Sequence, residues 1–189
     1  MASENKRPAR PITAEYLFRA AVHYLERYAS SSENLRRVLE RKVARRAMAR
    51  GEDAADFQPL IGTTVDKIVE LKLVDDDAYA EARLASLRRR GTSRRHAAAK
   101  LGVKGVPRSI VDRVLAEDEI EEADAAIRYA RRRRLGASGT RDRSERRDRD
   151  LAAMMRAGFG YADAVRALDA PAEHSIHADP SDDGEEPGA

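Results

Sequence analysis

Two segments of the chain share a pattern in which a helix ends at a glycine and another helix follows. The segments are Leu101-x-x-Lys104-Gly105-Val106 and Met154-x-x-x-Gly158-Phe159. In each, the glycine turn precedes a stretch whose apolar residues lie four or five positions further on. An approximate tandem repeat of this kind predicts an elongated body, because each unit packs mainly on its neighbours.

Apolar residues elsewhere recur at helical spacing, and no run alternates apolar and polar residues as a half-buried strand would. Aromatic residues make up only 5 % of the chain and there is no Trp. This composition suits thin layers of helices better than one thick core. The sequence therefore predicts an all-α fold of three tandem three-helix repeats that form an elongated, curved array.

The expected division of the chain follows from where its helices begin. We expect three-helix repeats over residues 13–74, 75–117 and 118–169, between a disordered N-terminus (1–12) and a disordered acidic tail (170–189). In the first repeat, residues 43–56 form a longer connector than the glycine turns of the other two. Its packing on the second repeat is therefore the least certain part of the predicted fold.

Short polar residues and glycines mark the expected helix ends. The residues placed to cap helices are Thr13, Ser30 to Ser32, Asp75, and Thr92 or Ser93. Gly91 should end the helix that follows Asp75, and Gly62 should weaken the third helix or move its start to about Thr63. The helix after Asp75 carries two apolar stripes, Tyr79, Ala82 and Ser86 beside Ala80, Leu84 and Leu87. We expect it to be packed on both sides.

The middle of the chain resembles a known family. The residues that carry the resemblance are Leu73-Val74-Asp75-Asp76, Tyr79-Ala80, Gly91 among arginines, and Leu101-x-x-Lys104-Gly105-Val106. Their order and spacing resemble the middle repeat of the bacterial RecX regulatory proteins, over about residues 13–168. The resemblance implies a protein that binds the RecA recombinase filament, lying in its helical groove across successive protomers. It also implies restraint of ATP hydrolysis, strand exchange and co-protease activity in the damage response, and it offers no catalytic residues to transfer. The long connector at 43–56 departs from the family's short Lys-Gly turn.

The distribution of charge points to a polyanionic partner. The chain has a net charge of +3, but residues 169–189 contain seven acids and no Lys or Arg, so that residues 1–168 carry +10. A basic body of this kind indicates a surface for nucleic acid, or for a protein wrapped around it. The alternative is that the Lys and Arg residues only solvate helix faces.

Arginine clusters occur about once per repeat, which suits a long binding face better than one pocket. Arg94 and Arg95 fall in the first turn of a predicted helix, where cations oppose the helix dipole by about 0.3–1 kcal/mol each. With the arginines that end the preceding helix, they form a candidate receptor for phosphate or carboxylate. The candidate filament- or phosphate-binding residues are Arg88, Arg89, Arg90, Arg94, Arg95, Lys104, Arg131, Arg132, Arg133, Arg134, Arg146 and Arg147.

Sequence motifs for catalysis are missing. There is no phosphate-binding glycine loop and no Cys, and Ser30 to Ser32 have no His or Lys placed to activate them. Asp75 to Asp77 are expected to cap a helix, and His174 and His177 lie in the tail without further ligands. The aromatic residues could stack on bases, but they sit on apolar stripes and are expected in the core. We therefore expect no enzyme and no cofactor, and a cytoplasmic monomer that does not contact membranes. Its expected partners are the RecA filament and single-stranded DNA, contacted directly or through the filament.

A second hypothesis is a nonspecific or helix-turn-helix-type DNA-binding protein. Three-helix units with a basic second helix resemble that module. A recognition helix should present Asn, Gln or Arg at neighbouring exposed positions. Residues 94–100 are nearly bare of such side chains after the first turn. This helix therefore predicts nonspecific affinity at most.

Overall fold

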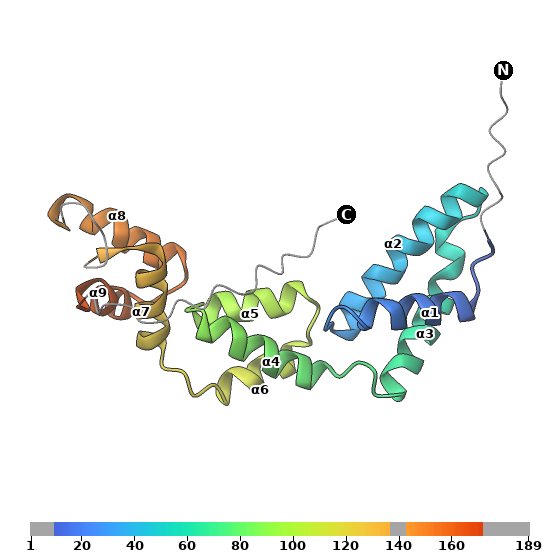
Figure 1. Cartoon of the computed structure of the whole chain (residues 1–189), viewed down its shortest axis with the longest axis horizontal. Coiled ribbons are helices and arrows are strands. Elements are labelled where there is room, and N and C mark those ends of the chain that lie inside the picture. The colour runs from blue at the N-terminus through green and yellow to red at the C-terminus, as the bar shows by residue number, and fades with distance from the viewer. Residues whose placement is uncertain (1–9, 137–142, 172–189) are drawn as a thin grey trace, which may run out of the picture.

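The computed structural model describes residues 10–136 and 143–171, and within these residues it is all-helical (Figure 1). The elements, in order, are α1 (Ala14–Leu25), α2 (Ser32–Arg50), the 3₁₀ helix η1 (Ala54–Phe57), α3 (Gln58–Glu70), α4 (Asp76–Arg89), α5 (Arg94–Val103), α6 (Arg108–Ala116), α7 (Glu122–Arg133), α8 (Arg143–Arg156) and α9 (Tyr161–Asp169). The helices form an elongated arc with α1–α3 at one end and α7–α9 at the other. The predicted all-α fold is confirmed.

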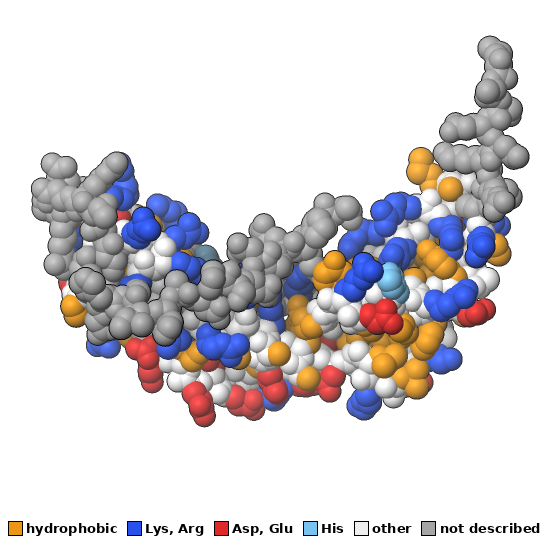
Figure 2. All heavy atoms as spheres, viewed as in Figure 1, with side chains coloured by type: hydrophobic (Ala, Val, Ile, Leu, Met, Phe, Trp, Pro, Cys, Tyr) orange, Lys and Arg blue, Asp and Glu red, His pale blue; other side chains and the backbone are white. Residues whose placement is uncertain are grey.

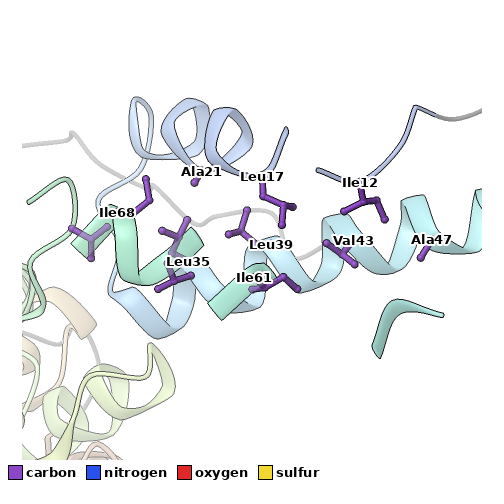
Figure 3. Close-up of a cluster of buried hydrophobic side chains, with 11 residues drawn as sticks. Ile12, Leu17, Ala21, Leu35, Leu39, Val43, Ala47, Ile61 and Ile68 are labelled. Carbon is purple, nitrogen blue, oxygen red and sulfur yellow. The ribbon is translucent and has the colours of Figure 1, made fainter. Parts of the chain in front are cut away.

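Three separate hydrophobic cores follow one another along the arc. The first lies among α1, α2 and α3, where Leu17, Leu39 and Ile61 are fully buried (Figure 3). The second lies among α4–α6 and the third among α7–α9. Each core draws its residues from one stretch of chain. We therefore propose an N-terminal unit (α1–α3), a middle unit (α4–α6) and a C-terminal unit (α7–α9), along the boundaries that the sequence predicts.

The helix ends lie where the capping residues predict them. Thr13, Ser31, Asp75 and Ser93 are N-caps, and the side chain of each accepts a hydrogen bond from a backbone N–H of the first turn. After α4, Gly91 has a φ of +76°, a conformation that glycine adopts without the steric penalty other residues meet. These local signals therefore place the ends of the helices correctly along the chain.

Of the two alternatives for Gly62, the structure shows the one in which the glycine lies inside the helix. α3 starts at Gln58, so a start near Thr63 is wrong. η1 leads directly into α3, and Pro59 occupies its first turn, where proline is favoured. The cost of a glycine inside a helix, about 1 kcal/mol, is too small to move a start that these signals set.

Burial also differs from the expectation at several positions. On α4 the stripe of Ala80, Leu84 and Leu87 is buried as expected and Tyr79 packs against the same core, but Ala82 of the other stripe is exposed. Tyr28, expected in the core, is 40 % exposed. Tyr161, expected in the core, is 64 % exposed. Ile12, which lies in the segment expected to be disordered, is buried in the first core. The remaining tail residues, 172–189, lie outside the described part of the chain.

Candidate functional site

The N-terminal and middle units meet at the beginning of α2. Ser31, the N-cap of α2, donates a hydrogen bond from its hydroxyl to the backbone carbonyl of Lys104. Ser32 donates from its N–H and its hydroxyl to the carboxylate of Asp76, over 2.7 and 2.6 Å. Gly105, with a φ of +77°, lies so close to α2 that an added Cβ would collide with it. We call this arrangement the first joint.

The middle and C-terminal units meet in the same way at the beginning of α5. Ser93, the N-cap of α5, donates from its hydroxyl to the carbonyl of Ala157 over 2.6 Å. The N–H of Arg94 donates to the carboxylate of Glu122, 3.2 Å away. Gly158, with a φ of +86°, lies where an added Cβ would come within 2.6 Å of the Ser93 hydroxyl oxygen. We call this arrangement the second joint.

Both joints use the same parts in the same order. In each, the cap serine of one unit donates its hydroxyl to a carbonyl of the next unit, and this carbonyl belongs to the residue before a glycine of positive φ. The acidic residue that begins the next unit's first helix accepts a backbone N–H from the residue after the cap serine. The glycine turns that repeat in the sequence are therefore the contacts between units. Because the same joint occurs twice, the units follow one another in an open arc (Figure 1).

Arg88, predicted to bind the filament or a phosphate, instead lies inside the protein. Its side chain is 0 % exposed and pairs with Asp118 at 2.7 Å and Glu122 at 2.8 Å. It also donates to the carbonyls of Thr92 and Ile120, over 2.8 and 2.7 Å. The prediction for Arg88 is wrong, because two carboxylates of the connection to the C-terminal unit have enclosed it. Its role is to link two units.

The other arginines around the α4–α5 turn are exposed. Arg94 is exposed but engaged: its side chain donates to the carbonyl of Asp118 over 2.7 Å and lies 3.5 Å from the carboxylate of the same residue. Arg89, Arg90 and Arg95 also reach solvent. Of the four, only Arg94 takes part in the second joint through its backbone.

Lys104, Arg131 and Arg134 have positions set by the ends of their helices. The carbonyl of Lys104 serves the first joint, and its residue is half-buried, as is Arg131. Arg134 is exposed and ends α7 in a left-handed conformation, with a φ of +54°.

Arg146 and Arg147 lie on α8 and are half-buried. Arg147 binds the carboxylate of Asp169 through two hydrogen bonds, of 2.6 and 3.0 Å. The hydrogen bond to Asp169 and the attraction of its charge raise the pKa of Arg147. This bidentate pair ties α8 to the end of α9, so Arg147 is already bound to an anion of its own chain.

Two of the predicted residues, Arg132 and Arg133, line a cavity of about 590 Å³ beside the second joint. Lys100 from α5 and Arg156 from α8 line it as well, and Tyr129 forms part of its wall. All four cations are exposed. Lys100 and Arg156 were not predicted from the sequence, because each stands outside the arginine runs. Their position could have indicated them, since both lie near the end of a unit's second helix, a few residues before the glycine turn.

Charge is unevenly distributed over the arc. Figure 2 shows Asp and Glu side chains gathered mainly along the outer edge, and many Lys and Arg side chains along the inner edge of both arms. Such a separation directs a polyanion toward the inner edge.

A cluster of metal ligands and a membrane-spanning helix are both absent from the described part of the chain. In residues 10–136 and 143–171, no three His, Asp or Glu side chains are grouped closely enough to hold a metal ion. None of the helices in these ranges combines the length and the apolar character that a membrane crossing requires. His174 and His177 lie outside the described part of the chain.

The chain is similar in sequence to known proteins, over the middle unit and beyond it. Residues 75–115, the middle unit, match the family model described as RecX, second three-helix domain. A Regulatory protein RecX of Myxococcus xanthus is 42 % identical over 168 residues, which cover 87 % of this chain and 89 % of the relative. The chain belongs to the RecX family.

Other RecX proteins are similar over most of the chain at lower identity. The Regulatory protein RecX of Halorhodospira halophila is 32 % identical over 82 % of this chain and 89 % of its own length. That of Agrobacterium fabrum is 30 % identical over 79 % of each chain. The resemblance seen between Leu73 and Val106 is thereby confirmed, and the RecX relatives are named as regulatory proteins.

Proposed function

We propose that this RecX protein binds the RecA–DNA filament and restrains its ATPase, strand-exchange and co-protease activities in DNA repair and the SOS response. It acts as a cytoplasmic monomer without enzymatic activity of its own. The observation that carries the proposal is the pair of equivalent joints, which sets three helical units in an open arc with cations along its inner edge. A filament is itself periodic, so successive units can each add a weak contact.

The alternative of a helix-turn-helix DNA reader receives no support from α5. A recognition helix places its N-terminal residues against base edges in the major groove. Here Ser93 is buried in the second joint, and the N–H of Arg94 is bonded to Glu122. The opposite end of α5 is held in the first joint through the carbonyl of Lys104. With both ends occupied by neighbouring units, α5 is not available to enter a groove.

ATP hydrolysis by RecA tests the proposed function. The protein is added in substoichiometric amounts to RecA on single-stranded DNA, and hydrolysis is followed over time. We expect inhibition, because one arc that contacts several protomers affects more than one active site. Unchanged hydrolysis at every ratio would contradict the proposal.

A charge reversal at Arg95 maps the contact. Arg95→Glu should inhibit RecA at least about tenfold less well, because it removes an exposed cation beside the second joint and adds a repulsive charge. Arg94 is unsuitable for this test, since its side chain binds Asp118 in the connection to the C-terminal unit. The control is Arg108→Glu on α6, whose side chain is 87 % exposed and whose ion pair with Asp112, at 2.9 Å, lies within the same helix. Far-UV circular dichroism should show both variants folded.

A further inference from the structure

The cavity beside the second joint gathers four cations without carboxylate partners among the described side chains. Lys100, Arg132, Arg133 and Arg156 come from three helices of two units and line one cavity of about 590 Å³. Among the described side chains, those of residues 10–136 and 146–171, no carboxylate lies within ion-pair distance of any of them. Arg132 and Arg133 each lie 5.9 Å from the centre of the Tyr129 ring, a contact that leaves their charge uncompensated. Elsewhere on this protein, exposed arginines do pair, as Arg113 does with Asp77 at 2.7 Å. Four cations of one sign around one cavity repel each other unless an anion joins them.

The first joint provides an internal control. Lys100 lies seven residues after the cap serine of the second joint, and the equivalent position after Ser31 is Val38. Counted in the same way from Glu122 and Asp76, Arg132 and Arg133 correspond to Ser86 and Leu87. Counted back from the joint glycines, Arg156 corresponds to Val103. None of these equivalents is charged, so a joint of this construction forms without the four cations.

The cations that do lie near the first joint have partners in the chain. Arg36 and Arg37 pair with Glu33 at 3.4 and 3.2 Å, and Arg37 also donates to the carbonyl of Val103 over 2.8 Å. The second joint thus differs from the first because its cations have no carboxylate partner among the described side chains, and such cations attract an external anion.

The geometry points to a single-stranded nucleic-acid backbone as the occupant, with phosphates held by Lys100, Arg132, Arg133 and Arg156. A single strand carries one negative charge per nucleotide, which supplies several anions to one cavity without any particular sequence. A protein partner would be anchored by apolar side chains entering the cavity. The aromatic wall residue Tyr129 is already used inside the unit, with its ring 5.4 Å from that of Phe159. A duplex is stiff over about 150 base pairs, so unlike a single strand it does not bend to bring several phosphates into one cavity.

This contact with single-stranded DNA rests on the proposed function and extends it. It would bring the regulator directly onto the strand that the recombinase covers. It needs no recombinase to occur. The two proposals can therefore fail separately: one is tested by ATP hydrolysis with RecA, the other by binding to bare DNA.

The test measures binding of the full chain to a fluorescent oligothymidine of about 20 nucleotides by anisotropy, over a series of salt concentrations. The cavity variant is Lys100→Gln with Arg156→Gln, one residue from each unit. We expect it to bind at least about tenfold more weakly at low salt. The slope of log affinity against log salt should fall by about 1.4, since each phosphate contact on a single strand contributes about 0.7.

The matched control removes the same charge away from the cavity. In Arg19→Gln with Arg108→Gln, both side chains are exposed, 71 % and 87 %, and neither lines the cavity. It should bind like the unaltered protein. Equal affinity and slope for the cavity variant, or equal losses in both variants, would overturn the inference. So would binding of free ATP without the oligonucleotide, or displacement by poly-glutamate as efficient as that by unlabelled oligothymidine.

Discussion

Arg88 and Arg89 are neighbours in an arginine run, yet their surroundings are opposite. The side chain of Arg88 is 0 % exposed and that of Arg89 faces solvent. Arg88 binds two carboxylates and two carbonyls, so its charge and its donors are satisfied inside the protein. Removing one member of such a buried group leaves the others without partners, and this penalty exceeds the net worth of the pair.

We therefore expect Arg88→Ala to lower the free energy of unfolding by about 3–5 kcal/mol, because Asp118, itself 6 % exposed, loses its cation. Urea denaturation followed by circular dichroism measures the change. Arg89→Ala is the control, and as an exposed substitution it should stay within about 0.5 kcal/mol of the unaltered protein. Equal stability of the two variants would show that the buried pairs contribute nothing.

Helices in this protein are joined through their ends. The cap serines bond within their own helix and to the next unit at once: the Ser93 hydroxyl accepts the N–H of His96 over 3.3 Å and donates to Ala157 over 2.6 Å. The glycines after α5 and α8 allow the close approach, since both have positive φ and no side chain to collide. A helix end thus sets both the length of the element and the position of its neighbour.

Gly158→Ala should lower the free energy of unfolding by about 2–4 kcal/mol, because it adds left-handed backbone strain to a collision with Ser93. Gly102→Ala makes a matched control: Gly102 lies within α5 and no atom lies within 4 Å of its added Cβ. That change should be neutral or stabilising by up to about 1 kcal/mol. Thermal denaturation of the two variants gives the comparison. A harmless Gly158→Ala would mean that the second joint is loose.

In the described part of the chain, three small cores and two joints hold the molecule together instead of one large core. Each core buries residues of its own unit, so the units interact mainly with their neighbours in sequence, as in repeat proteins. In such an open arc, Lys and Arg side chains lie along the inner edge of both arms (Figure 2). A compact fold of the same composition would present a partner with only one convex face.

Small-angle X-ray scattering should therefore report an extended particle. A compact protein of this length has a radius of gyration of about 16 Å, and we expect a clearly larger value with an asymmetric distance distribution. The chain trimmed to residues 10–171 controls for the termini and should remain above about 15 Å. A symmetric distribution near the compact value would contradict the arc.

The sequence by itself determined the helices, their caps and the repeat. These depend on interactions between residues a few positions apart, as at Asp75, Ser93 and Gly91, so local patterns suffice to predict them. The family could also be recognised, because its signature is one of order and spacing. The burial of Ile12 and the exposure of Ala82 and Tyr161 were misjudged, because neighbouring elements there outweigh local preference.

Only the tertiary structure decided which arginines are exposed to a partner. Arg88 and Arg89 look alike in the sequence, but Asp118 and Glu122 pair with Arg88 and bury it, whereas Arg89 faces solvent. Lys100 and Arg156 gather with Arg132 and Arg133 through the second joint, although 56 positions separate the first two. Burial and pairing between distant segments leave no local pattern, because they arise from how units pack, and this packing is where the candidate site is formed.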